Sequence, residues 1–397
     1  MSAPAVFAPA SRSDVLVAGG GLMGSSTAYF LKALAPSLEV VVVEPDPTYE
    51  FASSVRASGG ARRLFSCPEN IAMSNFSIPF IRDFAQAMAV DGERAEIEWK
   101  EGGYLFIVPP ESMGVLEENR AVQVANGAEV HLLSPAQVKE RFPSMRVDDL
   151  GGGAHSPRDG WCDPSGLLQG FRRKARSLGV AYLKDRVVSL RVAGASVASA
   201  TLASGAVLRA DAFVNATGAW SAQVAAMAGM ALPVSPMRRF EHFFSCATKL
   251  EPLPYVKDLA RLAFRPEAGG YSGGLVAGEE PRGFNFEVDH GWFERVVWPA
   301  LAHRFPAMEA ARCHRTWSGL YEQCELDGNP VIGPWRSGCA NLFTVAGFSG
   351  HGMMHAPAAG RAIAELIVHG GFRTIDLARF GYERIERGEA CPERGIV

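Results

Sequence analysis

The sequence predicts an α/β protein in which a Rossmann-like dinucleotide-binding domain is interleaved with an α+β domain built on an antiparallel sheet. Three observations support this fold class. A glycine cluster, "AGGGLMG", lies between an apolar strand and a helix, and a second apolar strand, "VVVVE", ends in an acid. The regular βα alternation then stops, which indicates that other material interrupts the nucleotide fold.

The composition is that of a globular protein with a sizeable core. The 397 residues are 48% hydrophobic, and the net charge of −3 gives no general attraction to nucleic acid. No apolar run reaches the ~18 residues of a membrane span, and residues 1–13 lack the features of a signal peptide. The seven cysteines are scattered without a C-x-x-C pair. We therefore expect reduced cysteines, a cytoplasmic location and no metal site.

The glycine cluster fits the G-x-G-x-x-G pattern as Gly19, Gly21 and Gly24. Gly19 permits a tight turn after the strand at 14–18, and Gly21 lets the backbone approach a pyrophosphate. Gly24 allows the helix at about 23–34 to pack closely on the strand. The phosphates would lie at the positive N-terminal end of that helix.

Glu44 ends the second apolar strand, where a carboxylate accepts hydrogen bonds from ribose hydroxyls and repels the 2′-phosphate of NADP. In an NAD-type fold, a second helix and a third parallel strand follow soon afterwards. Residues 45–70 are instead rich in small, basic and turn residues, and the stretch 97–108 alternates like an antiparallel strand. This interruption favours FAD, because FAD-type architectures build the nucleotide domain from separated pieces.

The rest of the chain supplies such pieces. In order, we expect a helix at about 69–89, a helix at 164–178 capped by Asp163, a strand at 180–192, a hairpin turning near 204–205, strand-like segments from 232 onward, a helix at about 290–303 and a third strand–turn–helix unit at 341–370.

Two further glycine turns follow apolar strands. Thr217 and Gly218 come directly after the strand at about 210–216, where a glycine lets the backbone lie close to a cofactor; read alone, the pair is a simple strand-ending turn. The run Gly347–Met353 precedes a helix whose first N–H groups would stabilise negative charge at the N1–C2=O edge of a reduced flavin. Two roles are open for His351 in this run: its side chain faces the flavin or the substrate, or it is a hydrogen-bonded structural histidine.

Arg62 and Arg63 follow "SGG" in the segment that replaces the missing βα unit. An arginine near a flavin binds a substrate carboxylate in a bidentate manner, and glycine-flanked loops at strand ends are where ligands bind. Ordinary surface arginines are the alternative. Arg238 and Arg239 are weaker candidates of the same kind.

The motifs "DVLVAGGGLMGSSTAYFL", "ASSVRASGGARRLFS", "NATGAWS", "GNPVIGP" and "VAGFSGHGMMHAPAAGRAIAEL" occur in the order found in the D-amino acid oxidase superfamily. Over nearly its whole length the chain resembles the sarcosine oxidase and glycine oxidase branch of these FAD-dependent enzymes. "FSCPENIAMS" and "DGWCDPSGLLQGFRRKARSLGV" are especially similar to the FAD-dependent oxidoreductase-domain proteins tied to complex I assembly.

The resemblance implies the glutathione-reductase-2/D-amino acid oxidase type of fold and FAD as cofactor. We expect an FAD-binding domain of residues 1–85, 146–222 and 318–397, and a substrate-binding domain of residues 86–145 and 223–317. The residues implied around FAD are Gly19, Gly21, Leu22, Met23, Gly24, Glu44, Ser53, Ser54, Gly60, Ala61, Val187, Thr217, Gly218, Gly347, Ser349, Gly350, His351, Gly352 and Met353.

Several residues depart from the family pattern. Gly319 stands where sarcosine oxidases carry the cysteine that bonds to the flavin, so we expect non-covalent FAD, with Cys324 close by in sequence. Tyr321 replaces the carboxylate-binding arginine of glycine oxidase, and Met354 replaces the substrate-binding lysine of sarcosine oxidases.

The stretch 269–286 also lacks the lysine that assists oxygen reduction in sarcosine oxidases; between residues 245 and 300 the chain has only Lys249 and Lys257. The sequence therefore does not decide whether oxygen or another compound accepts the electrons.

The sequence thus predicts an FAD-dependent oxidoreductase that oxidises the C–N bond of a small amine, amino acid or N-substituted amino or imino acid, such as a sarcosine- or iminodiacid-like compound. Hydride would pass to flavin N5, and the imine would then hydrolyse. Arg62 would anchor a carboxylate, and Tyr271, Tyr321 and His351 are the other pocket candidates. The alternatives are an FAD-containing assembly or interaction protein with little turnover, an amine dehydrogenase that does not use oxygen, and an NAD-linked dehydrogenase.

Overall fold

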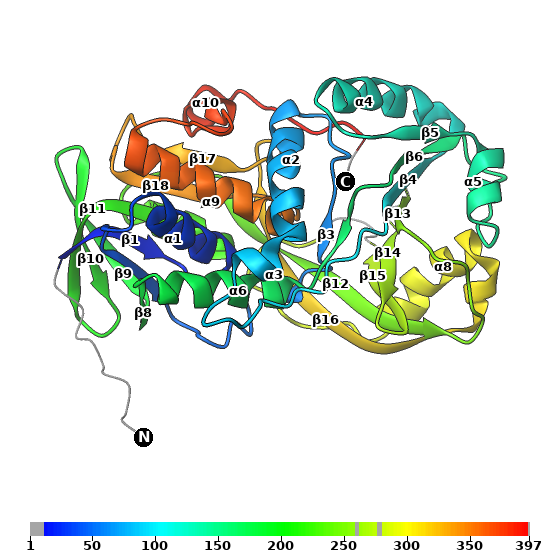
Figure 1. The fold of residues 1–397 in the computed structure, drawn as a ribbon, viewed down its shortest axis with the longest axis horizontal. Coiled ribbons are helices and arrows are strands. Elements are labelled where there is room, and N and C mark those ends of the chain that lie inside the picture. Colours follow the sequence, from blue (N-terminus) through cyan, green and yellow to red (C-terminus); the bar gives the residue numbers. More distant parts are fainter. Residues whose placement is uncertain (1–11, 259–261, 276–279, 396–397) are drawn as a thin grey trace.

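The computed structural model describes residues 12–258, 262–275 and 280–395. Two eight-stranded sheets form its framework, one in each half of the view in Figure 1. In the first sheet the strand order is β17-β18-β11-β1-β2-β8, with β9 and β10 attached to β11, and in the second it is β16-β12-β15-β14-β13-β4-β6-β5. The mixed α/β fold class predicted from the sequence is confirmed.

The first sheet begins with the predicted strand–turn–helix–strand unit. β1 (Arg12–Ala18) leads into α1 (Leu22–Leu34), and β2 (Val40–Glu44) returns beside β1 in parallel. Every side chain from Val15 to Ala18 is buried, as expected for a parallel strand that is covered on both faces.

The other strands of the first sheet come from distant parts of the chain. β8 (Ala181–Lys184) lies parallel to β2, β11 (Val207–Asn215) lies parallel to β1, and β18 (Leu342–Ala346) lies parallel to β11. β17 (Val331–Pro334) completes one edge in antiparallel orientation. The predicted interruption is confirmed, because the chain builds part of the second sheet before it returns beside β2.

The strand predicted at 180–192 is in fact two strands. β8 ends before Asp185, and β9 (Val187–Ala193) leaves the parallel sheet to form a hairpin with the strand that follows it. The Asp185 carboxylate accepts a hydrogen bond of 2.8 Å from the N–H of Arg186. This local turn breaks the extended run that the apolar pattern suggested.

The helices begin largely where expected. α6 (Pro164–Ser177) is capped by the carboxylate of Asp163. The helix predicted at 69–89 is divided into α2 (Pro68–Arg82) and the short α3 (Phe84–Ala87), and α2 has a proline in its last turn.

α9 (Gly352–His369) packs against α1 and α2, and α1 packs also against α6, so these helices lie together over the first sheet in Figure 1. Phe30, Phe80 and Phe171 join α1, α2 and α6, with ring centroids 5.5 and 5.7 Å apart.

The strands of the second sheet alternate between a packed face and a face turned toward α2. Leu105 and Ile107 of β4 belong to a hydrophobic cluster that includes residues of α5 and α8, whereas Tyr104 and Phe106 belong to a cluster with residues of α2. The strands of this sheet are β4 (Tyr104–Val108), β5 (His131–Leu133), β6 (Gly152–Ser156), β12 (Val234–Cys246), β13 (Tyr255–Asp258), β14 (Leu262–Glu267), β15 (Gly270–Leu275) and β16 (Ala311–Cys324).

The helix predicted at about 290–303 starts as a π-helical turn at Phe293–Val297 and continues as α8 (Trp298–Arg304). The remaining elements are β3 (Gly60–Ala61), β7 (Gly160–Trp161), β10 (Ser196–Leu202), α4 (Met113–Ala125), α5 (Pro135–Arg141), α7 (Ser221–Ala226) and α10 (Glu383–Arg387). Residues 276–278 of the segment expected as a strand lie outside the described residues.

Two elements cross the domain boundaries that the sequence suggested. β6 pairs into the second sheet although it falls within the 146–222 segment, and β16 runs through the boundary at 318. The division into two domains remains a proposal. In this proposal the boundary expected at 146 moves to the end of β6, and the boundary expected at 318 falls within β16.

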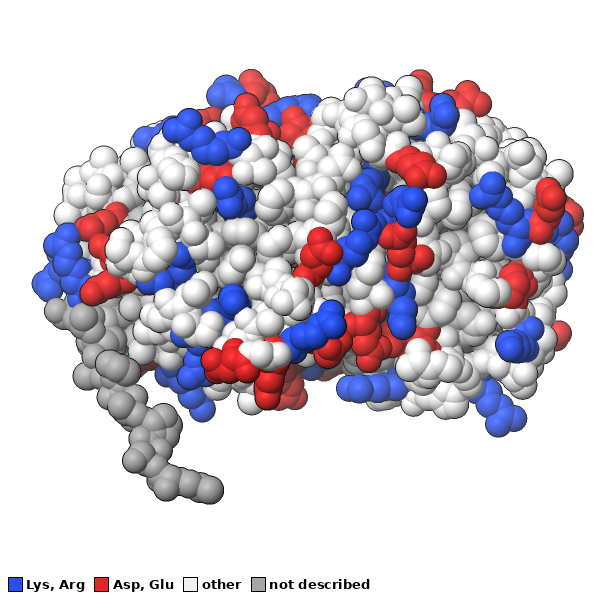
Figure 2. Space-filling model, viewed as in Figure 1, with Lys and Arg blue, Asp and Glu red and all other residues white. Residues whose placement is uncertain are grey.

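Charge is mixed over the surface. On the face drawn in Figure 2, Lys and Arg side chains are interspersed with Asp and Glu side chains over both halves of the molecule. Within the described ranges, no helix has both the length and the apolar character needed to cross a bilayer.

Candidate active site

Strand β16 separates two adjoining cavities. The glycine-turn cavity, named for Gly19 and Gly21 in its wall, has a volume of about 630 Å³. The sheet cavity, bounded by β12, β15 and β16, has a volume of about 1080 Å³. Both fall near the size range of ligand and cofactor sites. Gly350 and Met353 line both cavities, so a ligand in one cavity would reach the other.

The glycine turn is shaped by two glycines that the protein itself requires. Gly19 has a φ of +92°, and a Cβ there would lie 2.5 Å from the carbonyl oxygen of Ala216. A Cβ on Gly24 would lie 1.9 Å from the carbonyl oxygen of Gly19, so helix and turn touch at this point. These two predicted roles, a tight turn and close helix packing, agree with the geometry.

Gly21 differs, because a Cβ at this position would meet no atom within 4 Å. The open space belongs to the glycine-turn cavity. Gly21 is also the N-cap of α1 and, having no side chain, leaves the first N–H groups of the helix available to a ligand. An elongated, anionic group such as the pyrophosphate of a dinucleotide fits this arrangement.

Glu44 lies at the end of the glycine-turn cavity that is also lined by Val187. Its Oε2 accepts a hydrogen bond of 2.7 Å from the N–H of Gly20, and its Oε1 accepts one of 2.9 Å from the N–H of Asp46. Burial raises the pKa of Glu44, and these two backbone amides partly oppose that effect. The carboxylate thus holds the glycine turn in addition to facing the cavity.

Most of the predicted cofactor residues meet in one place. Those that line the glycine-turn cavity are Gly19, Gly21, Leu22, Met23, Glu44, Ser53, Ser54, Val187, Thr217, Gly218, Gly350, Gly352 and Met353. Gly60, Ser349 and His351 line the sheet cavity. Ala61 is fully buried in a hydrophobic cluster, and Gly347 turns the chain behind the wall with a φ of +86°.

The second glycine turn is fixed onto β16. The Ser349 hydroxyl accepts a hydrogen bond of 2.9 Å from the N–H of Cys324 and donates one of 3.2 Å to the Gly347 carbonyl. A Cβ on Gly350 would lie 2.4 Å from the ring of Tyr321. α9 begins directly afterwards, and its N-cap, His351, makes no side-chain capping bond, so the N-terminus of α9 points at the region where the two cavities join.

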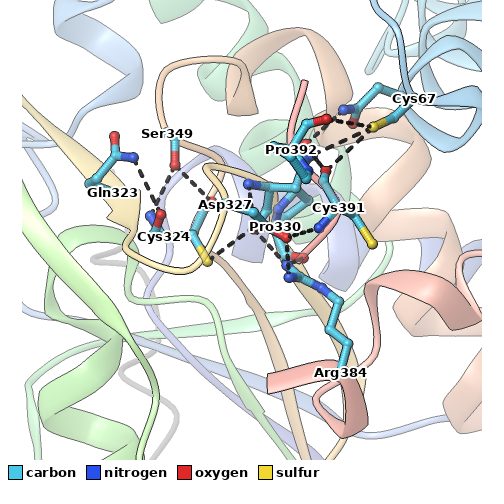
Figure 3. A network of polar contacts seen from close by, with 12 residues as sticks. Cys67, Gln323, Cys324, Asp327, Pro330, Ser349, Arg384, Cys391 and Pro392 are labelled. Carbon is cyan, nitrogen blue, oxygen red and sulfur yellow. Dashed lines mark hydrogen bonds and ion pairs between the residues drawn. The ribbon is translucent and has the colours of Figure 1, made fainter. Parts of the chain in front are cut away.

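The loop after β16 is anchored by the C-terminal segment (Figure 3). Asp327 forms a buried ion pair with Arg384, and its carboxylate also accepts a hydrogen bond of 2.7 Å from the N–H of Cys391. Arg384 donates to the carbonyl oxygens of Asn329 and Pro330. This network holds the end of β16, and therefore the partition between the two cavities.

Arg62 and Arg63 have different environments. The guanidinium of Arg63 is paired with Asp159 at 2.8 Å, which is a structural role. Arg62 is buried, donates to the Leu64 carbonyl at 2.6 Å and lies 3.9 Å above the ring of Phe65. Among the residues that the structure describes, no carboxylate is within salt-bridge distance of Arg62. Burial lowers the pKa of this guanidinium, which lines the sheet cavity.

Tyr321 and His351 lie in the same cavity as Arg62. The Arg239 guanidinium lies 5.2 Å from the Tyr321 ring centroid. Burial, together with the nearby charges of Arg62 and Lys257, lowers the pKa of His351 to about 3. His351 is therefore neutral at physiological pH, and its buried Nε2 has no hydrogen-bond partner in the described part of the chain.

Tyr271, the remaining pocket candidate, points elsewhere. It stacks on Phe244 and packs edge-on against Phe264, with centroid distances of 5.6 and 5.8 Å. Its neighbour Ser272 reaches Glu241, which lines the sheet cavity. Because side chains alternate along β15, Tyr271 faces the core, and the expectation that it lines the pocket is wrong. Arg238, a weaker candidate, pairs with Glu280 at 3.8 Å.

Three of the charged residues that line the cavities were not proposed as site residues from the sequence but bear on the chemistry. Glu241 of β12 and Lys257 of β13 line the sheet cavity, and Glu322 of β16 lines the glycine-turn cavity. In the sequence each resembles a solvent-facing residue of an amphipathic strand, because the pattern does not show which strands meet. Lys257 also matters for the choice of electron acceptor. The stretch 269–286 contains no lysine, but β13 places the Lys257 side chain in the wall of the sheet cavity.

Burial is the main cause of the pKa shifts of two carboxyl groups, Glu241 and Glu322. It raises the pKa of Glu241 to about 7, and the hydroxyl of Ser272 donates a hydrogen bond of 2.6 Å to its Oε1. It also raises the pKa of Glu322 to about 7, although the backbone amides of Gly347 and Phe348 oppose the shift. The Oε2 of Glu322 is buried without a partner among the described residues, as expected of a wall that a ligand completes.

Comparison with known proteins identifies the same cofactor. A family model described as "FAD dependent oxidoreductase" matches residues 14–366. FAD-dependent oxidoreductase domain-containing protein 1 of Xenopus laevis is 39% identical over 430 residues, which cover 98% of this chain and 86% of that protein. Mitochondrial sarcosine dehydrogenase of Mus musculus is 26% identical over 97% of this chain but only 43% of its own length. The structure of L-proline dehydrogenase from P. horikoshii superposes with a TM-score of 0.86 at 26% identity, covering 96% of this chain and 99% of that one.

Proposed function

The chain belongs to the FAD dependent oxidoreductase family, and from that premise we propose that it oxidises the C–N bond of an amino acid carrying a substituent on nitrogen, a sarcosine- or iminodiacid-like compound. FAD is the cofactor of this family, and the glycine-turn cavity fits it: Gly21 leaves room for the pyrophosphate, and Glu44 lies where a ribose would bind. When bound, FAD supplies the hydride acceptor for the carbon beside nitrogen.

The observation that carries this proposal is the buried guanidinium of Arg62. Arg62 forms no ion pair with a described residue, although the charges of Glu393 and Asp159 act on it from a greater distance. A cavity that offers a buried cation is ready for a ligand of opposite charge. Arg62 lies in the sheet cavity, which adjoins the glycine-turn cavity at Gly350 and Met353. A substrate carboxylate bound to Arg62 would therefore lie beside the cofactor site.

His351 and the start of α9 complete the arrangement. The neutral imidazole of His351 offers a hydrogen bond to substrate without adding a charge. The N-terminus of α9 directs its positive end toward the junction of the cavities, which favours negative charge that builds up there.

The preference for a substituted nitrogen is supported by the names of two relatives. Sarcosine dehydrogenase and L-proline dehydrogenase, both 26% identical to this chain, are named for an N-methyl and a cyclic amino acid. The volume of the sheet cavity, about 1080 Å³, leaves room for substrates larger than either.

We propose that FAD is held without a covalent bond. Gly319, at the position expected for a flavin-linked cysteine, has no side chain. The thiol of Cys324, at the next candidate position, lies 3.7 Å from the Asp327 carboxylate, and burial raises its pKa. A thiol is a poor nucleophile under these conditions.

We also propose a reducing compartment, cytoplasmic in the simplest case, because all seven cysteines are free thiols.

Product analysis tests the reaction. The FAD-loaded protein is incubated with sarcosine, L-proline, glycine and iminodiacetate in the presence of an artificial electron acceptor. We expect at least one of the N-substituted acids, sarcosine, L-proline or iminodiacetate, to yield acceptor reduction and a carbonyl or cyclic imine product in equal amounts, and glycine alone not to suffice. Acceptor reduction without such a product, or no reduction with any amine, contradicts the proposal and favours an FAD-containing protein with little turnover.

A further inference from the structure

A second ionisable side chain, opposite in sign to Arg62 and partly buried, lines the sheet cavity. Glu241 lies on β12, where it is paired across the sheet with Trp317 of β16. The hydroxyl of Ser272 donates a hydrogen bond of 2.6 Å to one of its oxygens. Within the described residues, no lysine, arginine or histidine nitrogen lies within salt-bridge distance of this carboxyl group.

The charged groups around Glu241 do not neutralise it. Arg265 of β14 is the cation whose charge lowers the pKa of Glu241. Its guanidinium, however, donates hydrogen bonds to the carbonyls of Ser58 and Pro266 and forms an ion pair with the carboxylate of Glu267. Glu267 itself disfavours a charge on Glu241. The carboxyl group thus has one hydrogen-bond donor, Ser272, and a cavity in front of it.

Besides Arg265 and Glu267, two phenols face Glu241 from the other strands. Tyr255 of β13 and Tyr321 of β16 both feel its charge, and burial raises the pKa of each. The Tyr321 hydroxyl also feels the charges of Arg62 and Arg239. Arg62 and Glu241 therefore act on the same region of the cavity with opposite signs.

We propose that Glu241 binds the ammonium group of a zwitterionic substrate whose carboxylate is held by Arg62, and that it removes one proton from that ammonium. This inference rests on the proposed function and names its substrate class: an amino acid with both groups free to ionise. It also supplies the proton acceptor that the sequence did not indicate.

The step balances without a further reactant. The N–H bond of the ammonium breaks, its proton moves to a carboxylate oxygen of Glu241, and the electron pair remains on nitrogen as the neutral amine. FAD, when bound, would supply the acceptor for the second step, the loss of hydride from the adjacent carbon. Only a neutral amine has the lone pair that this second step requires, so Glu241 would set the fraction of substrate that can react.

Matched ligand pairs separate recognition of the ammonium from recognition of the carboxylate. Sarcosine is compared with methoxyacetate, L-proline with tetrahydrofuran-2-carboxylate, and iminodiacetate with diglycolate; in each pair an ether oxygen replaces the nitrogen. FAD-loaded wild-type protein and the Glu241→Gln variant are titrated without oxygen, and the flavin absorbance reports binding and reduction. Glu389→Gln is the control, because Glu389 is exposed, lines neither cavity and is paired with Arg387 at 2.9 Å.

We expect Glu241→Gln to weaken the apparent affinity for the amines about tenfold to a hundredfold. The ether ligands should bind it as well as or better than they bind wild type, because a negative charge near their carboxylate is gone. In wild type the rate of reduction should fall as pH drops below about 7, and this limb should be absent in Glu241→Gln. Glu389→Gln should behave as wild type in all three respects.

An equal effect on amines and ethers, or no effect on either, overturns the assignment of Glu241. The proposed function fails separately: if Glu241→Gln weakens binding of the amines but not of the ethers, and no amine reduces the flavin of wild type, the oxidation is lost and the ammonium site stands. If amines reduce the flavin of both proteins with the same affinity and pH profile, the oxidation stands and the ammonium site is lost.

Discussion

Tyr321 and Glu322 are consecutive residues of β16 that differ in the cavities they line. Tyr321 lines both cavities and shares the sheet cavity with Arg62 and His351, whereas Glu322 lines the glycine-turn cavity alone, with its Oε2 3.8 Å from where a Cβ on Gly218 would be. β16 thus forms the partition between the proposed cofactor site and the proposed substrate site. We therefore expect substitutions of Glu322 to affect cofactor binding, and substitutions of Tyr321 to affect both sites.

Gly21→Ala and Gly24→Ala should separate ligand space from protein packing. Gly21 has a φ of −61° and an open cavity in front of it, so alanine should leave the unfolding free energy of the apoprotein within about 0.5 kcal/mol of wild type and weaken FAD binding tenfold or more. Gly24→Ala places a methyl group against the Gly19 carbonyl and should cost about 1–3 kcal/mol. Urea unfolding of the apoproteins and FAD titration by fluorescence quenching measure the two effects. Equal FAD affinity of Gly21→Ala and wild type would place the pyrophosphate elsewhere.

Arg62→Gln should discriminate between substrates by their carboxylate. For amino acids, the second-order rate constant of flavin reduction should fall about a hundredfold, because a charge-assisted bidentate contact is lost. Amines without a carboxylate should react equally with both proteins. Arg62→Lys keeps the charge but not the two-pronged geometry of the guanidinium, so its rate constant for amino acids should lie between those of wild type and Arg62→Gln. A uniform loss over all amines would show that Arg62 only supports the fold.

Glu322→Gln should change how stability depends on pH. The pKa of Glu322 is raised to about 7 in the folded protein from an ordinary value of 4.5, so the folded state binds more protons than the unfolded state between these values. Wild type should therefore lose stability relative to the variant as pH rises from 5 to 8, by about 2 to 3 kcal/mol. Urea unfolding of both apoproteins at pH 5 and pH 8 measures this difference.

The control for that experiment is Glu325→Gln, whose parent carboxylate is paired with Arg282 and has a lowered pKa. The ion pair of Glu325 stabilises the folded protein at neutral pH and is lost toward acid pH. Wild type should therefore gain a little stability relative to Glu325→Gln as pH rises, which is opposite in sign to the effect of Glu322→Gln. A pH-independent difference between wild type and Glu322→Gln would refute the buried, proton-holding carboxyl group.

Lys257→Met tests the choice of electron acceptor. If oxygen is the acceptor, the cation in the sheet cavity should assist its reduction, so the variant should reoxidise at least tenfold more slowly with oxygen while anaerobic reduction by substrate is unchanged. Stopped-flow mixing of the reduced protein with oxygenated buffer measures this rate. Slow reoxidation of wild type itself, with rapid transfer to an artificial acceptor, would instead identify a dehydrogenase.

Acid precipitation tests the mode of FAD attachment. We expect all of the flavin to remain in the supernatant of the precipitated holoprotein, since Gly319 offers no thiol and Cys324 is directed toward Asp327. Flavin that stays with the pellet in wild type but not in Cys324→Ser would show a covalent bond to that cysteine.

The cofactor side of the molecule could be predicted from the sequence because its constraints are local. Gly19 and Gly24 are required by backbone contacts within a single turn, and the interruption after Glu44 is visible as a loss of the βα pattern. The separated strands of the first sheet follow from that interruption. For the same reason short motifs sufficed to propose FAD-binding residues around both glycine turns, and most of these line the glycine-turn cavity.

The substrate side could be predicted only in part, because it depends on which strands meet and on which face each residue lies. Tyr271 was assigned to the pocket, but a shift of one residue along β15 separates the cavity face, with Ser272, from the core face. Glu241 and Lys257 carry no motif, and only the pairing of β12 to β15 and of β13 to β4 brings them to the cavity. Arg62 was found because its glycine-flanked loop marked it.

Anaerobic reduction of the bound flavin tests the central claim most directly. The FAD-loaded protein is mixed, without oxygen, with sarcosine, L-proline, glycine and iminodiacetate over a range of concentrations, and the yellow absorbance of the oxidised flavin is followed. We expect at least one N-substituted amino acid to bleach it with saturating concentration dependence, and Arg62→Gln to weaken that response. A flavin that remains oxidised with every amine, in a protein that binds FAD stoichiometrically, would contradict the assignment of this chain as an amino acid oxidoreductase.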